Sequence, residues 1–301
     1  MDRNFRIACV GEVMIELIAG DGNAAELNVA GDTYNAAAYL KRAAPELHVE
    51  YVTVLGRDRF SDRIVRDMKA RGIGTAAVTR HPNRMPGLYA IETDAAGERS
   101  FAYWRSSSAA RTLFDADGRD PADVLASHDL VLLSGISIAI LSGAARDRLR
   151  NALEGFRANG GLLAFDSNFR PHLWKDLRLA RAETERFWQC TDIALPSVDD
   201  EMALFGDADD SEVIARLRSW GVSRGALKRG DAGPVDLGAD GHALPVPMAE
   251  HVVDTTAAGD SFNAGYLAAT ATGRSSIKAM ESGHALALKV IGRRGAIVDI
   301  D

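Results

Sequence analysis

The chain has 301 residues, of which 47% are hydrophobic and 26% are charged, and its formal net charge is −7. These values are those of a soluble globular protein that is long enough for one large α/β domain, or for one domain with a small appendage. The acidic balance argues against a protein that binds nucleic acid broadly, because such proteins present a basic face.

The sequence also argues against secretion and membrane insertion. Residues 1–7 run into an apolar segment that Glu12 interrupts, which is too short and too charged for a signal peptide. The longest strongly apolar run, Leu130–Leu141, is too short to cross a bilayer. Cys9 and Cys190 are too few for a disulfide framework. We therefore expect a cytoplasmic protein with no membrane partner.

Apolar runs alternate with helical patterns along most of the chain. Strands are predicted at Ile7–Val10, Val52–Leu55, Leu130–Leu133, Leu162–Phe165, Ile193–Leu195 and Gly225–Lys228. Helical spacing and charge predict helices over Ser61–Arg71, Ser142–Asn159, Leu177–Cys190 and Asp210–Trp220. Strands that alternate with helices indicate a mostly parallel central sheet covered on both faces. The predicted fold class is α/β, with residues 1–301 in a single domain.

One region breaks this alternation. The runs Leu88–Thr93 and 99–105 flank a Gly-bearing turn at 94–98, which predicts a β-hairpin. Phe101, Tyr103 and Arg105 share one face of it, because side chains two residues apart point the same way. Further strands are expected between about residues 16 and 29. We expect a small sheet, built from about 12–34 and 86–108, that covers the main sheet as a lid.

The common nucleotide and metal motifs are missing from the sequence. It has no Gly-x4-Gly-Lys-Ser/Thr loop, and no Gly-x-Gly-x-x-Gly follows the first strand. The histidines are scattered without zinc-ligand spacing. A nucleotide must therefore be held by other segments.

The most informative segment is 254–265, Asp-Thr-Thr-Ala-Ala-Gly-Asp-Ser-Phe-Asn-Ala-Gly. Its small residues let a turn present several N–H groups to one point, and a helix N-terminus adds partial positive charge, which favours phosphate. Asp260 within such a site suits a base that takes a proton from a hydroxyl beside the phosphate. An isolated Gly-Asp pair is more often an ordinary helix cap. The longer pattern favours phosphoryl transfer to an alcohol.

Three other segments carry polar groups that suit a ligand. The segment 228–233, Lys-Arg-Gly-Asp-Ala-Gly, is a basic, Gly-rich turn after a predicted strand, although exposed cations alone would also explain it. Asn168 and Arg170 follow another strand end, where open α/β sheets bind ligands, although Arg170 also suits a surface cation. In 30–37, Gly31 permits close approach, and Asp32 and Asn35 can bond vicinal hydroxyls. An ordinary helix cap is the alternative there.

Together these segments resemble the ribokinase-like (PfkB) family of carbohydrate kinases. Residues 254–265 resemble its second signature, 228–233 its Lys-x-Gly-x-x-Gly nucleotide turn, and 30–37 its first signature, with Ala30 where a second Gly is common. The resemblance implies a ribokinase-like three-layer sandwich with a small β-sheet lid, and the use of ATP and Mg²⁺. It leaves open a monovalent cation, K⁺, near Asp254 and Thr256. We also expect a homodimer.

Nearly the whole chain resembles the branch of this family that phosphorylates 2-keto-3-deoxygluconate. The segments 86–94, 97–99, 103–105, 133–137 and 170–171 carry this likeness. The substrate-binding residues that it implies are Gly31, Asp32, Asn35, Tyr89, Tyr103, Trp104, Arg105, Arg170 and Asp260. Arg105 and Arg170 suit a sugar acid, because a guanidinium can donate two hydrogen bonds to one carboxylate. A fructokinase-like kinase of another sugar or sugar acid, and a non-catalytic sugar sensor, are the alternatives.

The resemblance also implies the roles of the remaining residues. Asp260 would act as general base toward the terminal hydroxyl of the sugar acid. The backbone N–H groups of Ala257, Ala258 and Gly259 would form an anion hole for the transferring phosphoryl group. The nucleotide would contact these three residues together with Asn168, Arg170, Lys228, Gly230 and Gly233.

Overall fold

The computed structural model describes residues 5–20, 24–93, 99–238 and 241–300. Its strands are β1 Arg6–Val10, β2 Met14–Ala19, β3 Ala25–Ala30, β4 His48–Leu55, β5 Val78–Arg80, β6 Leu88–Thr93, β7 Arg99–Trp104, β8 Leu130–Ser134, β9 Leu162–Asp166, β10 Ile193–Ala194, β11 Ala226–Leu227 and β12 Val235–Asp236. Its α-helices are α1 Asp32–Ala43, α2 Arg59–Ala70, α3 Pro121–Leu125, α4 Gly135–Ile140, α5 Gly143–Ala158, α6 Leu177–Trp188, α7 Val198–Phe205, α8 Asp210–Ser219, α9 Ala258–Ala271 and α10 Ser276–Ile291. Short 3-10 turns cover Ala109–Thr112, Pro171–Leu173 and Gly230–Ala232.

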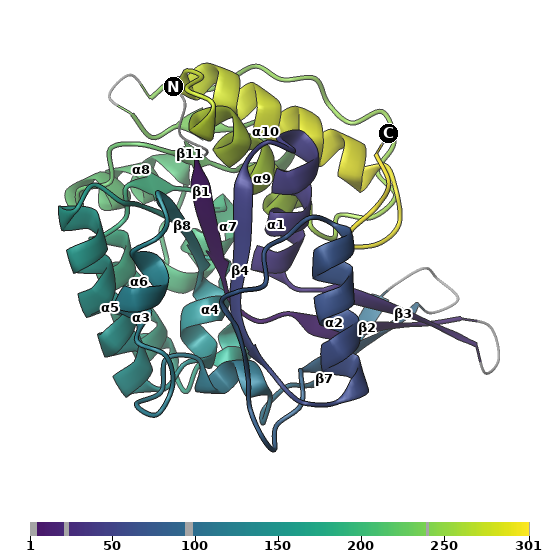
Figure 1. The fold of residues 1–301 in the computed structure, drawn as a ribbon. Coiled ribbons are helices and arrows are strands. Elements are labelled where there is room, and N and C mark those ends of the chain that lie inside the picture. The colour runs from purple at the N-terminus through teal and green to yellow at the C-terminus, as the bar shows by residue number, and fades with distance from the viewer. Residues whose placement is uncertain (1–4, 21–23, 94–98, 239–240, 301) are drawn as a thin grey trace.

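The central sheet has six parallel strands in the order β10-β9-β8-β1-β4-β5. Its two faces bury alternate residues of the same strands. In β1, Ile7 and Cys9 pack with α1, α2, α9 and α10, whereas Ala8 and Val10 pack with α3, α5, α6 and α8. Figure 1 shows these two groups of helices on opposite sides of the sheet. The prediction of a parallel sheet between two helical layers is confirmed.

One predicted strand of this sheet is confirmed only in part. Residues 225–228 were expected to extend the parallel sheet, but β11 pairs with β12 in a separate antiparallel sheet. Only isolated parallel bridges, Ala194 to Gly225 and Ser197 to Lys228, join this segment to the end of β10. A Cβ atom on Gly225 would lie 1.8 Å from the carbonyl oxygen of Ala194, so the close approach of the two segments requires glycine there.

A second sheet has the order β3-β2-β6-β7 and projects beside the central sheet (Figure 1). Its outer pairs, β2 with β3 and β6 with β7, are antiparallel, and its middle pair, β2 with β6, is parallel. The predicted hairpin strands and the expected strands between residues 16 and 29 are thus present. The turn predicted at 94–98 lies outside the described residues.

The strand order reverses at β1, because β4 lies on one side of it and β8 on the other. In open parallel sheets the carboxyl ends of the strands at such a point form a ligand-binding crevice. No helix in the described part of the chain is both long and apolar enough to cross a membrane.

Candidate active site

A cavity of about 900 Å³ lies at the carboxyl ends of the central strands. Met14 and Tyr89 of the second sheet line it, as do Ile136 after β8, Asp166 at the end of β9 and Ser197 after β10. The predicted site residues that line this cavity are Gly31, Asp32, Asn35, Tyr89, Tyr103, Arg105, Asn168, Arg170, Lys228, Gly230, Ala257, Ala258, Gly259 and Asp260. The fold thus brings together residues from the first third and the last sixth of the sequence.

Three helices begin at this cavity with an uncapped N-terminus. Gly31, Ser197 and Ala257 are the N-cap residues of α1, α7 and α9; all three line the cavity, and no side chain at these positions accepts a hydrogen bond from the first turn. Each of the other described α-helices has such a side-chain cap. The N–H of Val198 at the start of α7 donates to the carbonyl of Lys228 over 2.9 Å. The remaining first-turn N–H groups and the helix dipoles favour anions in the cavity.

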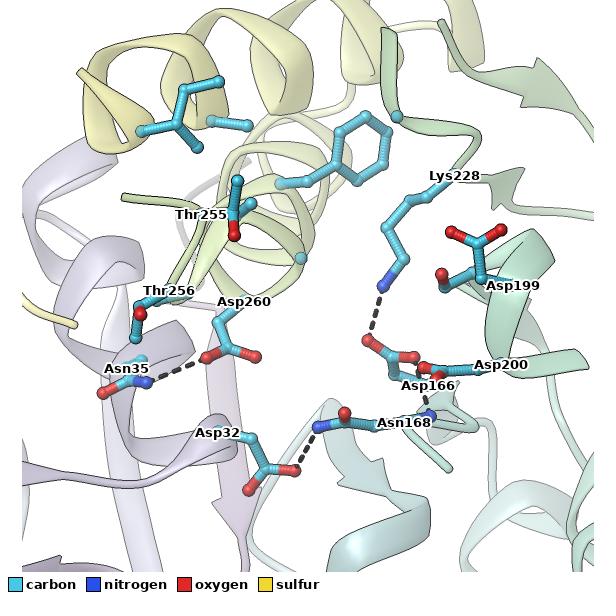
Figure 2. A pocket seen from close by; sticks show the side chains of 18 of the residues that line it. Asp32, Asn35, Asp166, Asn168, Asp199, Asp200, Lys228, Thr255, Thr256 and Asp260 are labelled. Atoms are coloured by element: carbon cyan, nitrogen blue, oxygen red, sulfur yellow. Dashed lines mark hydrogen bonds and ion pairs between the residues drawn. The ribbon is translucent and has the colours of Figure 1, made fainter. Parts of the chain in front are cut away.

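Asp260 projects into the cavity from the first turn of α9 (Figure 2). The amide nitrogen of Asn35 donates to its carboxylate over 2.8 Å. Although the residue keeps some contact with solvent, removal of its carboxyl from water raises the pKa of Asp260 to about 8, and the negative charge of Asp32 adds to the effect. A carboxyl whose pKa is raised in this way is a stronger base than an ordinary aspartate, which favours transfer of a proton from a hydroxyl.

An acidic centre that sequence analysis did not assign lies opposite Asp260. The ammonium group of Lys228 contacts Asp166, and it also lies 3.1 Å from the amide oxygen of Asn263. The amide nitrogen of Asn263 donates to the same Asp166 oxygen over 2.6 Å. A Cβ on Gly259 would lie 3.5 Å from the Lys228 nitrogen, so the ammonium reaches the start of α9. Asp166 thus pairs with Lys228 and positions its ammonium group; Lys228 is the one lysine among the described residues that line the cavity.

Asn168 joins this centre to the first signature segment. Its amide nitrogen donates to Asp32 over 2.9 Å, and its backbone N–H donates to Asp166 over 3.2 Å, as Figure 2 shows. Asn168 has a φ of 31° and Ala257 a φ of 60°, both in the left-handed region that non-glycine residues rarely adopt. Backbone strain of this kind persists where the surrounding structure holds it, often at functional sites.

The two arginines expected to bind a carboxylate already have acidic partners. Arg105 is buried, and its Nε donates to Glu12 over 2.8 Å while its Nη2 contacts the same oxygen. Glu12 follows β1 and is itself buried. Arg170 is more exposed and pairs with Asp200 of α7 over 3.2 Å. Both residues line the cavity, and a guanidinium has five N–H donors, so each keeps donors beyond those used by its acidic partner.

Three predicted residues stand apart from the cavity lining. Trp104 does not line it and is 62% exposed, because it lies on the face of β7 opposite to Tyr103. Gly233 forms the turn after Lys228, where its φ is 75°, and does not line the cavity either. Thr256 lines the cavity but Asp254 does not; the Asp254 carboxylate accepts from Thr256 and from the N–H of Gly295 over 2.9 Å. Direct ligand contact by Trp104 and Gly233 is therefore not supported.

One member of the predicted anion hole is partly occupied. The N–H of Ala258 donates to the carbonyl of Thr255 over 3.2 Å, a long bond at the start of α9.

In the described chain, no group of three or more His, Cys, Asp or Glu side chains is arranged to hold a metal ion. Asp166 and Asp200 line the cavity, and their carboxylates suit the waters of a divalent cation.

Known proteins resemble the chain over nearly its whole length. A 2-dehydro-3-deoxygluconokinase of Dickeya dadantii (strain 3937) is 44% identical over 305 residues, which cover 98% of this chain and 97% of the relative. The crystal structure of a PfkB protein from Polaromonas sp. JS666 has a TM-score of 0.84 at 25% identity and covers 96% of each chain. That of a putative ribokinase II from E. coli, in complex with ATP and Mg²⁺, has a TM-score of 0.83 at 22% identity, covers 98% of this chain and 95% of that one, and shows the same fold. Residues 4–301 match the family described as pfkB family carbohydrate kinase. The chain therefore belongs to the PfkB family, as its sequence signatures predicted, and is a carbohydrate kinase with a ribokinase-like fold.

Proposed function

We propose that this kinase transfers the γ-phosphoryl group of ATP to the 6-hydroxyl of 2-dehydro-3-deoxy-D-gluconate. The observation that carries the proposal is the presence of two guanidinium groups, Arg105 and Arg170, in the same cavity as the Asp260 carboxyl. A neutral sugar offers these guanidinium groups only hydroxyl oxygens, whereas a sugar acid offers a carboxylate, the acceptor that arginine prefers. The 2-dehydro-3-deoxygluconokinase relative at 44% identity supports the same substrate.

In the proposed reaction, the hydroxyl oxygen of the sugar acid forms a bond to the γ-phosphorus while the bond from that phosphorus to the β-γ bridging oxygen breaks. Asp260 accepts the hydroxyl proton, and Asn35 holds the carboxylate in place through its 2.8 Å hydrogen bond. The uncapped start of α9 at Ala257 and the nearby ammonium of Lys228 stabilise negative charge on the phosphoryl oxygens. A bound Mg²⁺, held through its waters by Asp166 and Asp200, would neutralise charge on the phosphates.

We further propose that the second sheet acts as a lid within a single 1–301 domain. Tyr89 and Tyr103 on this sheet line the cavity, so closure would bring their rings over the sugar acid. Exclusion of water by such a cover would suppress hydrolysis of ATP.

The substrate is tested by measuring ADP release with the keto-deoxy acid, gluconate, fructose and ribose as acceptors. We expect the highest kcat/KM for the keto-deoxy acid. Arg105→Lys keeps a cation beside the buried Glu12 but loses the planar fork, so it should lose tenfold or more with that acceptor and much less with a neutral sugar, because a buried charge-assisted hydrogen bond contributes roughly 1.5–3 kcal/mol. Highest efficiency with fructose or ribose would contradict the proposed substrate while leaving the kinase family intact.

The base is tested with Asp260→Asn, which keeps the shape of the side chain and removes its capacity to accept the proton. We expect kcat to fall by about 10²–10⁴-fold, with little change in ATP affinity measured by calorimetry. Turnover near that of the wild type would remove Asp260 from the chemistry.

A further inference from the structure

His172 lines the cavity, although no sequence motif pointed to it. It lies in the 3-10 turn Pro171–Leu173 that follows β9. Its ring stacks on that of Tyr103 with 5.6 Å between centroids and 29° between planes, and Tyr103 stacks in turn on Tyr89 at 5.8 Å and 28°. The His172–Tyr103 contact therefore connects the second sheet to the loop after β9 beside the cavity.

The charges around the imidazole are those of the two arginines. Partial burial lowers the pKa of His172 below its ordinary 6.5, and the positive charges of Arg105 and Arg170 lower it further. Helix α4, which packs against this turn, carries no charged residue. Asp200 is connected to this group of charges through its ion pair with Arg170. Tyr103, the ring stacked on the imidazole, is the remaining titratable neighbour.

We propose that His172 is a specificity-determining residue that binds the substrate carboxylate together with Arg105 and Arg170. The inference rests on the proposed function, because only an acid substrate carries this group. Arg105 shares its charge with Glu12, and Arg170 shares its charge with Asp200. His172 has no hydrogen-bond or ion-pair partner among the described residues. Its N–H is therefore a donor for which no acid of the protein competes.

A carboxylate bound beside His172 would favour the protonated imidazole, since an opposite charge stabilises the charged form. Binding of the acid would then take up protons, and by linkage its affinity would rise as the pH falls through the imidazole pKa. A neutral sugar would lack this effect.

The test compares wild type with His172→Gln by calorimetric titration with 2-dehydro-3-deoxy-D-gluconate between about pH 6 and about pH 8. Because His172 is exposed, the variant is expected to fold. We expect it to bind the acid roughly 3–10-fold more weakly than wild type at the acidic end, with the gap narrowing as the pH rises. Wild type should also take up more protons on binding, measured in buffers of different ionisation enthalpy. Titration of Asp260 is common to both proteins and cancels in the ratio of dissociation constants.

His242→Gln is the matched control, because His242 is exposed and does not line the cavity. It should keep the pH dependence of the wild type. The role of His172 is overturned if wild type binds the acid but the ratio of the two dissociation constants, wild type to His172→Gln, is the same at every pH. The proposed substrate would still stand. If wild type phosphorylates a neutral sugar and fails to bind the acid, the proposed substrate falls, and the role of His172 falls with it.

Discussion

Asn35 donates its amide nitrogen to Asp260, and its amide oxygen accepts the N–H of Gly31 over 3.3 Å. This second bond fixes which end of the amide faces the carboxylate, because an oxygen directed at Asp260 could not donate. The asparagine that the sequence assigned to the sugar therefore also orients the proposed base. A hydrogen bond to the carboxylate favours its charged form and opposes the rise in the pKa of Asp260.

The Asn35→Ala variant removes that bond, so the pKa of Asp260 should rise further above its wild-type value of about 8. Since the base must be ionised to accept a proton, kcat/KM falls as the pH falls through this pKa. We expect the acidic limb of the pH profile to move to higher pH in Asn35→Ala, together with a lower plateau. An unchanged limb with a raised KM would mean that Asn35 only binds the sugar.

At the scale of secondary-structure elements, two glycines set how closely α9 packs on α10. A Cβ on Gly265 would lie 2.5 Å from the backbone oxygen of Ser282, and one on Gly283 would lie 2.8 Å from that of Phe262. Larger residues would force the helices apart, and α9 carries Asp260 in its first turn. Gly265 within the signature segment is thus required by the packing of α9 on α10.

We expect Gly265→Ala to lower the free energy of unfolding by about 1–3 kcal/mol through overpacking, measured by denaturant titration. The matched control is Gly155→Ala in α5, where an added Cβ would meet no atom within 4 Å. That variant should gain about 0.5–1 kcal/mol, because alanine loses less backbone entropy in a helix. Equal effects at the two positions would show that helix propensity, not contact between α9 and α10, determines the outcome.

How well the sequence predicted an element depended on whether its periodicity was local. The helix expected over 142–159 is present as α5 at 143–158, because its apolar spacing and its N-cap Ser142 both lie within the segment. Strand β4 begins at His48 instead of Val52, since His48 and Glu50 are polar and lengthen the strand only through its pairing with β1. The antiparallel pairing of β11 with β12 could not be predicted either, because it also depends on a partner strand. Strand partners are tertiary contacts that a short run of residues does not encode.

In the site, too, residues with a local sequence signal were predicted, and residues whose role depends on tertiary contacts were not. Residues inside a signature, such as Asp260 and Lys228, were found from the sequence, and the fold places them in one cavity. Asp166 received no role from the sequence, although a carboxylate that ends a buried strand at the ligand-binding edge is a usable signal. Glu12, two residues after the end of β1, carries a similar signal. His172 had none, because its role depends on Tyr103 from a distant part of the chain.

At the scale of the whole molecule, a buried pair connects β4 to the segment after α3. His128 lies 3.3 Å from Glu50, and the same carboxylate accepts the N–H of Ala77 over 2.8 Å. Glu50 is 6% exposed. The hydrogen bond with His128 is the main cause that lowers the pKa of Glu50 below its ordinary 4.5, against the opposing effect of burial.

Because the folded pKa of Glu50 lies below the unfolded one, its contribution to stability is present above pH 4.5 and is lost as the pH falls through the folded value. We expect Glu50→Gln to lower the free energy of unfolding at neutral pH by roughly 1–3 kcal/mol. The difference from wild type should shrink as the pH falls below 4.5 and through the folded pKa, because Glu50 itself then becomes protonated. Urea titrations at both pH values measure this, and a gap that stays constant would contradict it.

The three uncapped helix starts at Gly31, Ser197 and Ala257 have a practical consequence for the empty enzyme. Sulfate or inorganic phosphate should settle among these N–H groups and raise the melting temperature of the protein without any sugar present. The same ions would then compete with the phosphates of the nucleotide for this site. Kinetic constants taken in phosphate buffer should accordingly show a higher apparent KM for ATP than those taken in a zwitterionic buffer of equal ionic strength.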